Sequence, residues 1–191
     1  MKKAIAFLLC LSVTFGVAEA QETDTQAKIA SAMSAAPASI AENATIKDWP
    51  SSEGEEMPTL KEGSNQFTCL PDIPDTPGND PMCLDGPWLK WADAWMNKKE
   101  LSIDKMGFGY MLQGGTPESN TDPYAEGPEE GNEWLDDPVP HLMIIVPNNS
   151  MLSGLPVTSE GGGPWVMWRD TPYVHIMVPM PKYNPPTRAS Y

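Results

Sequence analysis

The amino-acid sequence predicts a loop-rich α+β fold, in which a small, mostly antiparallel sheet of about four strands is packed on one side by helices. Three observations predict this fold class. Short alternating or apolar runs, which are typical of strands, recur between residues 103 and 178. One earlier run, from Trp88 to Lys99, has its large apolar residues at helical spacing instead. The 21 prolines and 15 glycines indicate that much of the chain is loop.

The first 20 residues have the three parts of a secretory signal. Two lysines follow Met1, an apolar run extends from Ala4 to Val17, and residues 18–20 are Ala-Glu-Ala. An uncleaved anchor is the alternative, but the run is shorter than the ~20 residues that span a bilayer. We expect cleavage after Ala20 and an exported, periplasmic or secreted protein that is not attached to a membrane after cleavage.

The rest of the chain divides by composition. Residues 21–44 form a polar, Ala-rich segment, in which we expect a frayed start and one or two short helices, with Pro37 in the first turn of the second. Residues 45–183 are expected to form a single α+β domain, and residues 184–191 a C-terminal tail.

The chain is strongly acidic. Its net charge is −14, and removal of the signal, with two lysines and one glutamate, makes it one unit more negative. Such a charge repels nucleic acid and anionic lipid surfaces and favours cationic partners. We therefore expect no nucleic-acid partner, and the sequence does not indicate an oligomeric state.

Two cysteines, Cys69 and Cys83, remain after cleavage of the signal. In an oxidising compartment such a pair predicts a disulfide bond. Closing a loop of this length stabilises a fold by ~3 kcal/mol in the chain-entropy model. A metal-binding or redox pair is the alternative, but the spacing matches neither a C-x-x-C motif nor a zinc site.

The predicted helix has recognisable ends. Asp85 can cap its first turn, Pro87 suits the first helical positions, and Lys98 and Lys99 complement the negative end of the helix dipole.

Four strands follow the helix, at residues 103–113, 141–146, 166–169 and 173–178, with a hairpin turn at 170–172 between the last two. Alternate side chains of a strand point to opposite faces. The aliphatic faces, which we expect the helix to cover, carry Leu142, Ile144, Val146, Val174, Ile176 and Val178.

The opposite strand faces predict a small-molecule cleft. They carry histidine, methionine and tyrosine, and the two glycines of the first strand leave room above the sheet. Trp134, in a long acidic loop, is a further candidate for contact with a ligand. The predicted ligand-binding residues are His141, His175, Tyr173, Gly107, Gly109 and Trp134.

Both histidines belong to a His-x-Met pair, His141 with Met143 and His175 with Met177. In a strand each pair presents an imidazole and a thioether on one face, a ligand set that suits copper, especially Cu(I). The simpler interpretation is that these methionines fill the core. No other cofactor is predicted.

No catalytic motif is present in the sequence. A small hydrolase or isomerase, with His175 as a base beside Asp170 or Asp104, is one alternative. The eight carboxylates between residues 118 and 137 could also bind Ca²⁺, although a solvated acidic loop explains them more simply. Our leading hypothesis is a non-enzymatic module that binds a small ligand.

Several segments resemble a family of small, exported bacterial proteins of unknown function. The resemblance lies in Thr68–Asp72, Asp80–Asp85, Trp95-Met96, Gly107–Gly115, Pro140–Pro147 and Tyr173–Pro179. It covers most of residues 27–180 and implies one domain, but it carries over no activity, cofactor or catalytic residue.

Overall fold

A mixed β-sheet forms the centre of the molecule. The computed structural model describes residues 13–52, 54–128 and 131–182. Within these residues eight strands form one sheet, and two short strands form a separate ribbon. The strands are β1 (Thr45–Lys47), β2 (Thr59–Lys61), β3 (Thr68–Leu70), β4 (Met82–Leu84), β5 (Gly107–Met111), β8 (His141–Ile145), β9 (Trp165–Met167) and β10 (His175–Pro179), with β6 (Glu118–Ser119) and β7 (Trp134–Leu135) in the ribbon.

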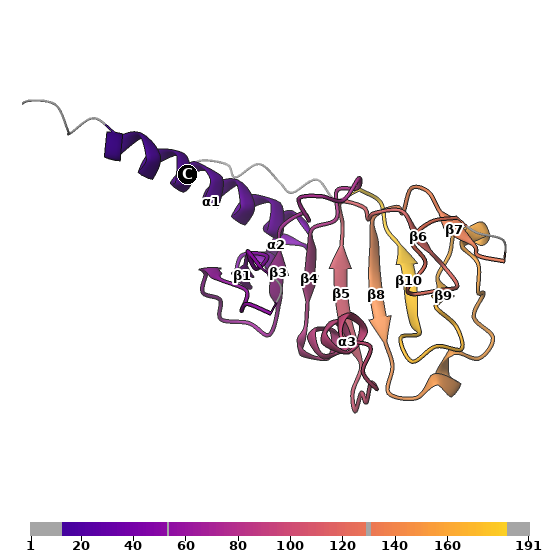
Figure 1. Cartoon of the computed structure of the whole chain (residues 1–191). Coiled ribbons are helices and arrows are strands. Elements are labelled where there is room, and N and C mark those ends of the chain that lie inside the picture. The colour runs from indigo at the N-terminus through magenta and orange to yellow at the C-terminus, as the bar shows by residue number, and fades with distance from the viewer. Residues whose placement is uncertain (1–12, 53, 129–130, 183–191) are drawn as a thin grey trace, which may run out of the picture.

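The order of strands in the sheet is β2-β1-β3-β4-β5-β8-β10-β9 (Figure 1). The predicted fold class is therefore wrong. The sheet has twice the expected number of strands, and it is mixed because β1 and β3 are parallel. The four strands predicted from the sequence are its C-terminal half. The N-terminal strands have three residues each, too short to show an alternating pattern, and they lie in proline-rich sequence.

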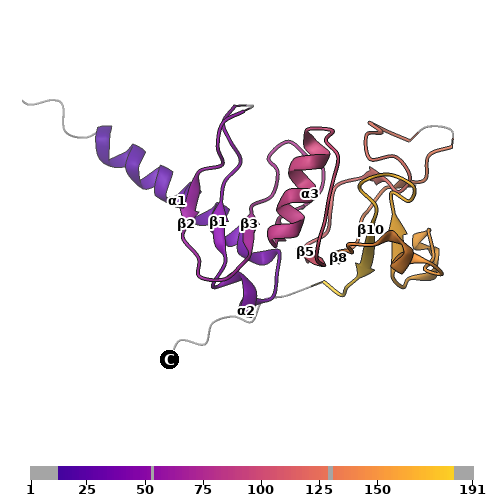
Figure 2. The same ribbon diagram turned by 90° about the horizontal axis from the view of Figure 1, so that it is seen from below.

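Three α-helices accompany the sheet in the described residues: α1 (Val13–Ser34), α2 (Ala38–Ala41) and α3 (Gly86–Met96). Two 3₁₀ turns, Asn149–Leu152 and Ser159–Gly161, lie between β8 and β9. Figure 2 shows α3 and α2 on opposite sides of the sheet. We call the side that α3 covers the α3 face. A row of paired residues crosses it from Leu84 through Gly109, Met143 and Met177 to Trp165.

The helix covers the opposite set of side chains from the one predicted. On β8 the buried residues are His141, Met143 and Ile145, whereas Leu142 and Ile144 are only half-buried on the other face. The same alternation on β10 leaves Ile176 and Val178 half-buried, and Val146 and Val174 beside the strands are half-buried as well. Glycines at positions 107 and 109 explain this choice, because they allow the large side chains of α3 to approach the α3 face.

Residues 86–96 form the helix that the tryptophan spacing predicts, and Asp85 is its N-terminal cap. The Asp85 carboxylate accepts hydrogen bonds from the backbone N–H of Trp88 (3.1 Å) and of Phe108 (2.8 Å). This buried side chain thus caps α3 and joins it to β5. The helix ends at Met96, so Lys98 and Lys99 follow it, and Lys99 forms an ion pair with Asp93 instead.

Helix α1 continues across the predicted cleavage site, and its first turns project away from the sheet (Figure 1). Residues 21–27, which we expected to be frayed, are helical. Pro37 is the N-cap of α2. Residues 1–12 of the predicted signal and residues 184–191 of the predicted tail lie outside the described residues. Within the described part of the chain, no helix has both the length and the hydropathy that crossing a membrane requires.

The predicted disulfide between Cys69 and Cys83 is confirmed. It joins β3 and β4 at directly paired positions and closes the proline-rich arch of residues 70–82. Within the arch, the Asp80 carboxylate accepts hydrogen bonds from the Ile73 N–H and the Thr76 hydroxyl, both at 2.9 Å. The Asp72 carboxylate accepts one from the Asp80 N–H at 2.7 Å. These bonds hold the arch in one conformation beside the α3 face.

Candidate ligand-binding site

Both histidines lie on one face of the sheet, as the strand pattern predicts, but it is the face that α3 covers rather than an open one, and they do not converge. The pairing of β8 with β10 places His141 opposite Pro179, four residues along the strand from His175. This corresponds to about 13 Å at the usual rise of a strand. Met143 and Met177 face one another between them. The side chains are sealed from bulk solvent, with 1% of His141 and 3% of His175 exposed.

A cavity of about 160 Å³ lies between α3 and the sheet, and His175 lines it. Four tryptophans contribute to its wall. Three of them come from one side of α3, and Trp168 comes from the turn between β9 and β10. We call this space the tryptophan cavity. It is lined by Trp88, Trp91, Trp95 and Trp168, by Met82, Met111, Met143 and Met177, by the apolar residues Ile73, Leu84 and Ala92, and by the polar residues Asp80, Thr116, Glu118 and His175.

Trp168 is held in a conformation that large side chains rarely adopt. Its φ angle is 53°, in the left-handed region. Two hydrogen bonds fix it there. The indole N–H donates to the Ser119 carbonyl (2.6 Å), and the backbone N–H donates to the Asn120 carbonyl (2.9 Å). The ring stacks on Trp91 with centroids 5.5 Å apart. Local strain of this kind is often found at functional sites.

His175 presents an unused nitrogen lone pair. Its Nδ1 lies 2.9 Å from the Tyr173 carbonyl oxygen, so this nitrogen carries the proton and donates it. The Nε2 atom has no hydrogen-bond partner among the described residues. The rings of Trp88, Trp91 and Trp168 surround the imidazole at centroid distances of 5.2–5.4 Å. Burial lowers the pKa of His175 to about 4, so it is neutral at physiological pH.

Glu118 is the carboxylate in the cavity wall without a partner. The Asp80 carboxylate accepts two hydrogen bonds from residues of the arch. The Glu118 side chain has no hydrogen bond to a described residue. Burial raises the pKa of Glu118 to about 7, and the negative charge of Asp80 adds to this increase. Burial also raises the pKa of Asp80. An empty cavity therefore holds a carboxyl group that is about half-protonated near neutral pH.

The indole N–H of Trp88 has no acceptor. It is the one side-chain nitrogen or oxygen in the described part of the chain that is fully covered by other atoms and has no hydrogen-bond partner. Trp91 and Trp95, on the same helix, donate to the carbonyls of Tyr173 (3.2 Å) and Pro123 (3.1 Å). A buried donor without a partner reduces stability by about 1–3 kcal/mol.

His141 and Trp134 lie elsewhere, in a second pocket, which is larger, about 420 Å³. The His141 Nδ1 lies 2.7 Å from the Val139 carbonyl oxygen, and burial lowers the pKa of this histidine. The exposed Asp136 and Asp137 line the same pocket. Met177 borders both this pocket and the tryptophan cavity.

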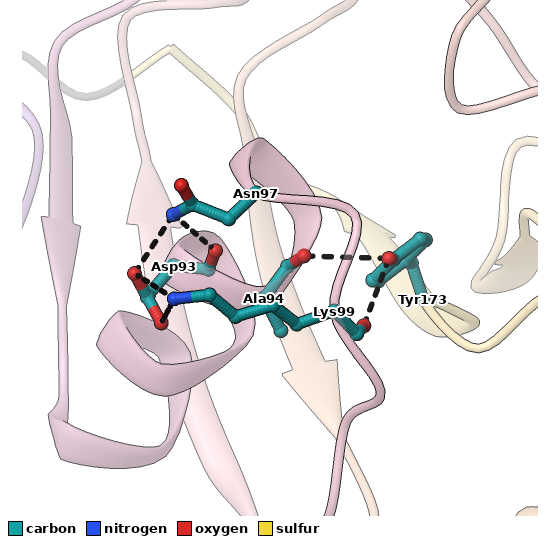
Figure 3. A network of polar contacts seen from close by, with 5 residues as sticks. All are labelled: Asp93, Ala94, Asn97, Lys99 and Tyr173. Carbon is teal, nitrogen blue, oxygen red and sulfur yellow. Dashed lines mark hydrogen bonds and ion pairs between the residues drawn. The ribbon is translucent and has the colours of Figure 1, made fainter. Parts of the chain in front are cut away.

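Tyr173, predicted to contact a ligand, fixes the end of α3 instead. Its hydroxyl lies within hydrogen-bond distance of the carbonyl oxygens of Ala94 (3.3 Å) and Lys99 (3.0 Å), as Figure 3 shows. The same view shows Asp93 bonded to the Asn97 amide and to the Lys99 ammonium group. Tyr173 therefore holds the segment after the helix against the sheet.

The predicted glycines do not floor an open cleft. A Cβ atom at Gly107 would lie 2.7 Å from the Pro87 Cβ, and one at Gly109 would lie 3.0 Å from atoms of Leu84 and Met143. The space above these glycines is thus filled by the start of α3 and by core side chains. Their function in the fold is to let the helix pack closely on the sheet.

Two chemical alternatives came from the sequence, a copper site and a hydrolase or isomerase with a histidine base. Among the described residues no group of three or more histidines, cysteines or acidic residues is arranged to hold a metal ion. A copper site on His141 and Met143, or on His175 and Met177, would depend on thioether ligands and stays a prediction. Neither histidine has a carboxylate hydrogen-bond partner among these residues, so the pairing of His175 with Asp170 or Asp104 is not formed here.

No family model, curated protein or solved structure matches this chain. The resemblance to small exported bacterial proteins therefore stays a prediction, and the geometry of the site alone supports a functional proposal.

Sequence reasoning missed most of the tryptophan cavity. It placed the tryptophans of α3 in the core and Glu118 in a solvated acidic loop. One usable signal was the alternation of Thr116 and Glu118 after the end of β5, because both side chains then lie on the same side of the chain and line the cavity. Asp80, within five prolines, offered no comparable signal.

Proposed function

We propose that this protein is a non-enzymatic binding protein for a small organic molecule, which occupies the tryptophan cavity. The observation that carries the proposal is the cavity itself, which lies between α3 and the sheet and is walled mainly by four tryptophans. A cavity of about 150 Å³ accommodates a benzene-sized ligand, so a cavity of 160 Å³ suits a molecule of six to ten heavy atoms. The unpaired Glu118 carboxyl and the Nε2 atom of His175 add polar groups that would orient such a ligand.

The test is a ligand screen read by thermal shift and by the intrinsic fluorescence of the tryptophans. The screen covers sugars, aromatics, carboxylic acids and amines of six to ten heavy atoms. We expect at least one class to raise the melting temperature of the wild type and to lose this effect in Trp88→Phe, which removes one ring of the indole from the cavity wall.

The matched control is Trp49→Phe. The Trp49 indole lies away from the cavity and donates to the Pro71 carbonyl at 2.9 Å. A control that still responds to the ligand supports the proposal. The proposal fails if no compound shifts the wild type, or if Trp88→Phe and His175→Ala respond as the wild type does.

Cu(I) binding is a second candidate, supported by one specific observation. His175 has its proton fixed on Nδ1 by a backbone carbonyl, which leaves Nε2 available, and Met143 and Met177 line the same cavity. Titration with Cu(I) under anaerobic conditions should then give one equivalent of binding that His175→Ala abolishes. Binding weaker than micromolar, or unchanged in His175→Ala, removes this candidate.

We also propose that the protein is exported to the periplasm or secreted. The signal-like N-terminus supports this proposal, and the Cys69–Cys83 disulfide is consistent with an oxidising compartment. Mass spectrometry of the protein from fractionated bacterial cells should find a mature N-terminus at Gln21 outside the cytoplasm. An intact N-terminus in the cytoplasmic fraction would contradict it.

A further inference from the structure

The charge of the tryptophan cavity is one-sided. Its lining includes two acidic side chains, Asp80 and Glu118, and no lysine or arginine. His175, the other ionisable group in the wall, is neutral at physiological pH because burial lowers its pKa. Asp80 is already bonded to the arch, so Glu118 is the acid that is free to bind a ligand. The ionised forms of these two acids would repel an anionic ligand.

The apolar part of the wall has the composition that recognises organic cations. Tryptophan attracts a cation over its ring face more strongly than other side chains do, and the attraction increases when water is excluded. Trp91, Trp95 and Trp168 stack on one another with centroids 5.5–5.9 Å apart, and all three line the cavity. An alkylammonium group in this cavity would contact the indole surface that lines it and still lie in the same space as Glu118.

We propose that the ligand of the tryptophan cavity is a small organic cation, whose alkylated ammonium group packs against the indoles with ionised Glu118 as its counter-charge. This inference rests on the proposed binding function and specifies its ligand class. A hydroxyl group on the same molecule would donate to the His175 Nε2 atom, whose lone pair is unused. The net charge of −14 attracts such ligands to the protein from solution.

The proposal implies that binding depends on pH. A cation binds the ionised form of Glu118, whose pKa in the empty cavity is about 7. The groups that face it are Asp80 in the arch, supported by Asp72, and His175 on β10, which stays neutral above pH 6. The ionised form of Glu118 is a minor fraction at pH 6 and the major fraction at pH 8. The affinity for a cation should therefore increase about ten-fold from pH 6 to pH 8.

Two isosteric probes test the inference. Choline carries a quaternary ammonium group and a hydroxyl, and 3,3-dimethylbutan-1-ol has the same shape without the charge. Calorimetry at pH 8 should show choline binding at least ten-fold more tightly than the neutral alcohol, an advantage that shrinks at pH 6. At pH 6 choline binding should also release close to one proton, seen by comparing buffers with different ionisation enthalpies.

Glu118→Gln is the decisive variant, and Glu126→Gln is its control. Glu126 is exposed in the same acidic loop, so its variant makes the same change in net charge away from the cavity. We expect Glu118→Gln to lose the preference for choline and its pH dependence, and to keep whatever affinity the neutral alcohol has. Glu126→Gln should bind choline as the wild type does.

The outcomes separate this inference from the proposed function. Equal affinity for the two probes shows that the ligand need not be a cation and leaves a cavity for neutral ligands. A choline preference that survives in Glu118→Gln refutes Glu118 as the counter-charge. Binding of sugars, neutral aromatics or carboxylic acids from the screen, but of neither probe and of no amine, refutes a cationic ligand. No binding by either probe or by any compound of the screen overturns both.

Discussion

The unpaired carboxyl of Glu118 should make the stability of the protein depend on pH, even when no ligand is present. Burial raises its pKa from 4.5 to about 7, so the folded protein holds this proton more tightly than the unfolded chain does. Between pH 4.5 and 7 the folded state therefore binds more protons, and the stability falls as the pH rises through this window. Glu118→Gln, with a neutral amide of the same shape, should not show this loss.

The magnitude follows from the displacement of the pKa. Raising it from 4.5 to about 7 reduces the stability of the wild type by about 3 kcal/mol at pH 8 and by about 1 kcal/mol at pH 5. The variant should thus be more stable than the wild type at pH 8, with most of the advantage gone at pH 5. A carboxylate without a partner in a cavity lowers the stability of a protein, and such a cost is common where the group is needed for binding.

Urea denaturation followed by tryptophan fluorescence at pH 5 and pH 8 measures the effect. The difference between wild type and variant is the useful quantity, because the lowered pKa values of His141 and His175 make both proteins less stable as the pH falls below 6.5. Glu126→Gln should differ from the wild type by less than about 0.5 kcal/mol at both pH values. If the stabilities of the wild type and of Glu118→Gln change in parallel from pH 5 to pH 8, the carboxyl is solvated and the reasoning fails.

Three further predictions concern the packing around the cavity. Gly107→Ala should destabilise the protein by about 1–3 kcal/mol, and Gly109→Ala by less. The reason is that a Cβ at Gly107 meets the Pro87 ring, whereas one at Gly109 meets the mobile ends of Leu84 and Met143. Equal losses of stability in urea denaturation would contradict this account. Tyr173→Phe should cost about 1 kcal/mol, since the hydrogen bond to the segment after α3 is lost, and calorimetric unfolding would refute it by showing no change. Replacing Cys69 and Cys83 together by alanine should cost ~3 kcal/mol in the same assay, as expected for closing a loop of this length, and a double variant as stable as the oxidised wild type would show that the arch holds itself without the bond.

The sequence was sufficient for elements that repeat a pattern over several residues. Helix α3, with its Asp85 cap, follows from the spacing of Trp88, Trp91 and Trp95, and the four C-terminal strands follow from apolar runs. The strands β1 to β4 have three residues each, and β3 and β4 are flanked by prolines that ordinarily indicate a loop. Their pairing is fixed by tertiary contacts, including the disulfide, which one sequence does not order.

The sequence also does not predict which face of the sheet α3 covers, and here the reason is not the length of the strands. Leu142 and Ile144 are as apolar as Met143 and Ile145, so the β8 sequence alone does not indicate which side is covered. Gly109 decides it, because this residue pairs with Met143 and leaves space for Trp88. That argument requires the order of the strands. Glu118 was missed because its strand, β6, has two residues and no periodicity.

Met177 has a consequence for how the two spaces on the α3 face relate to one another. Met177, with its flexible thioether side chain, is the one residue that lines both the tryptophan cavity and the pocket beside His141. A rotation of its side chain that enlarges one compartment takes volume from the other. Occupants of the two compartments would therefore influence each other reciprocally, each altering the affinity of the other by the same factor.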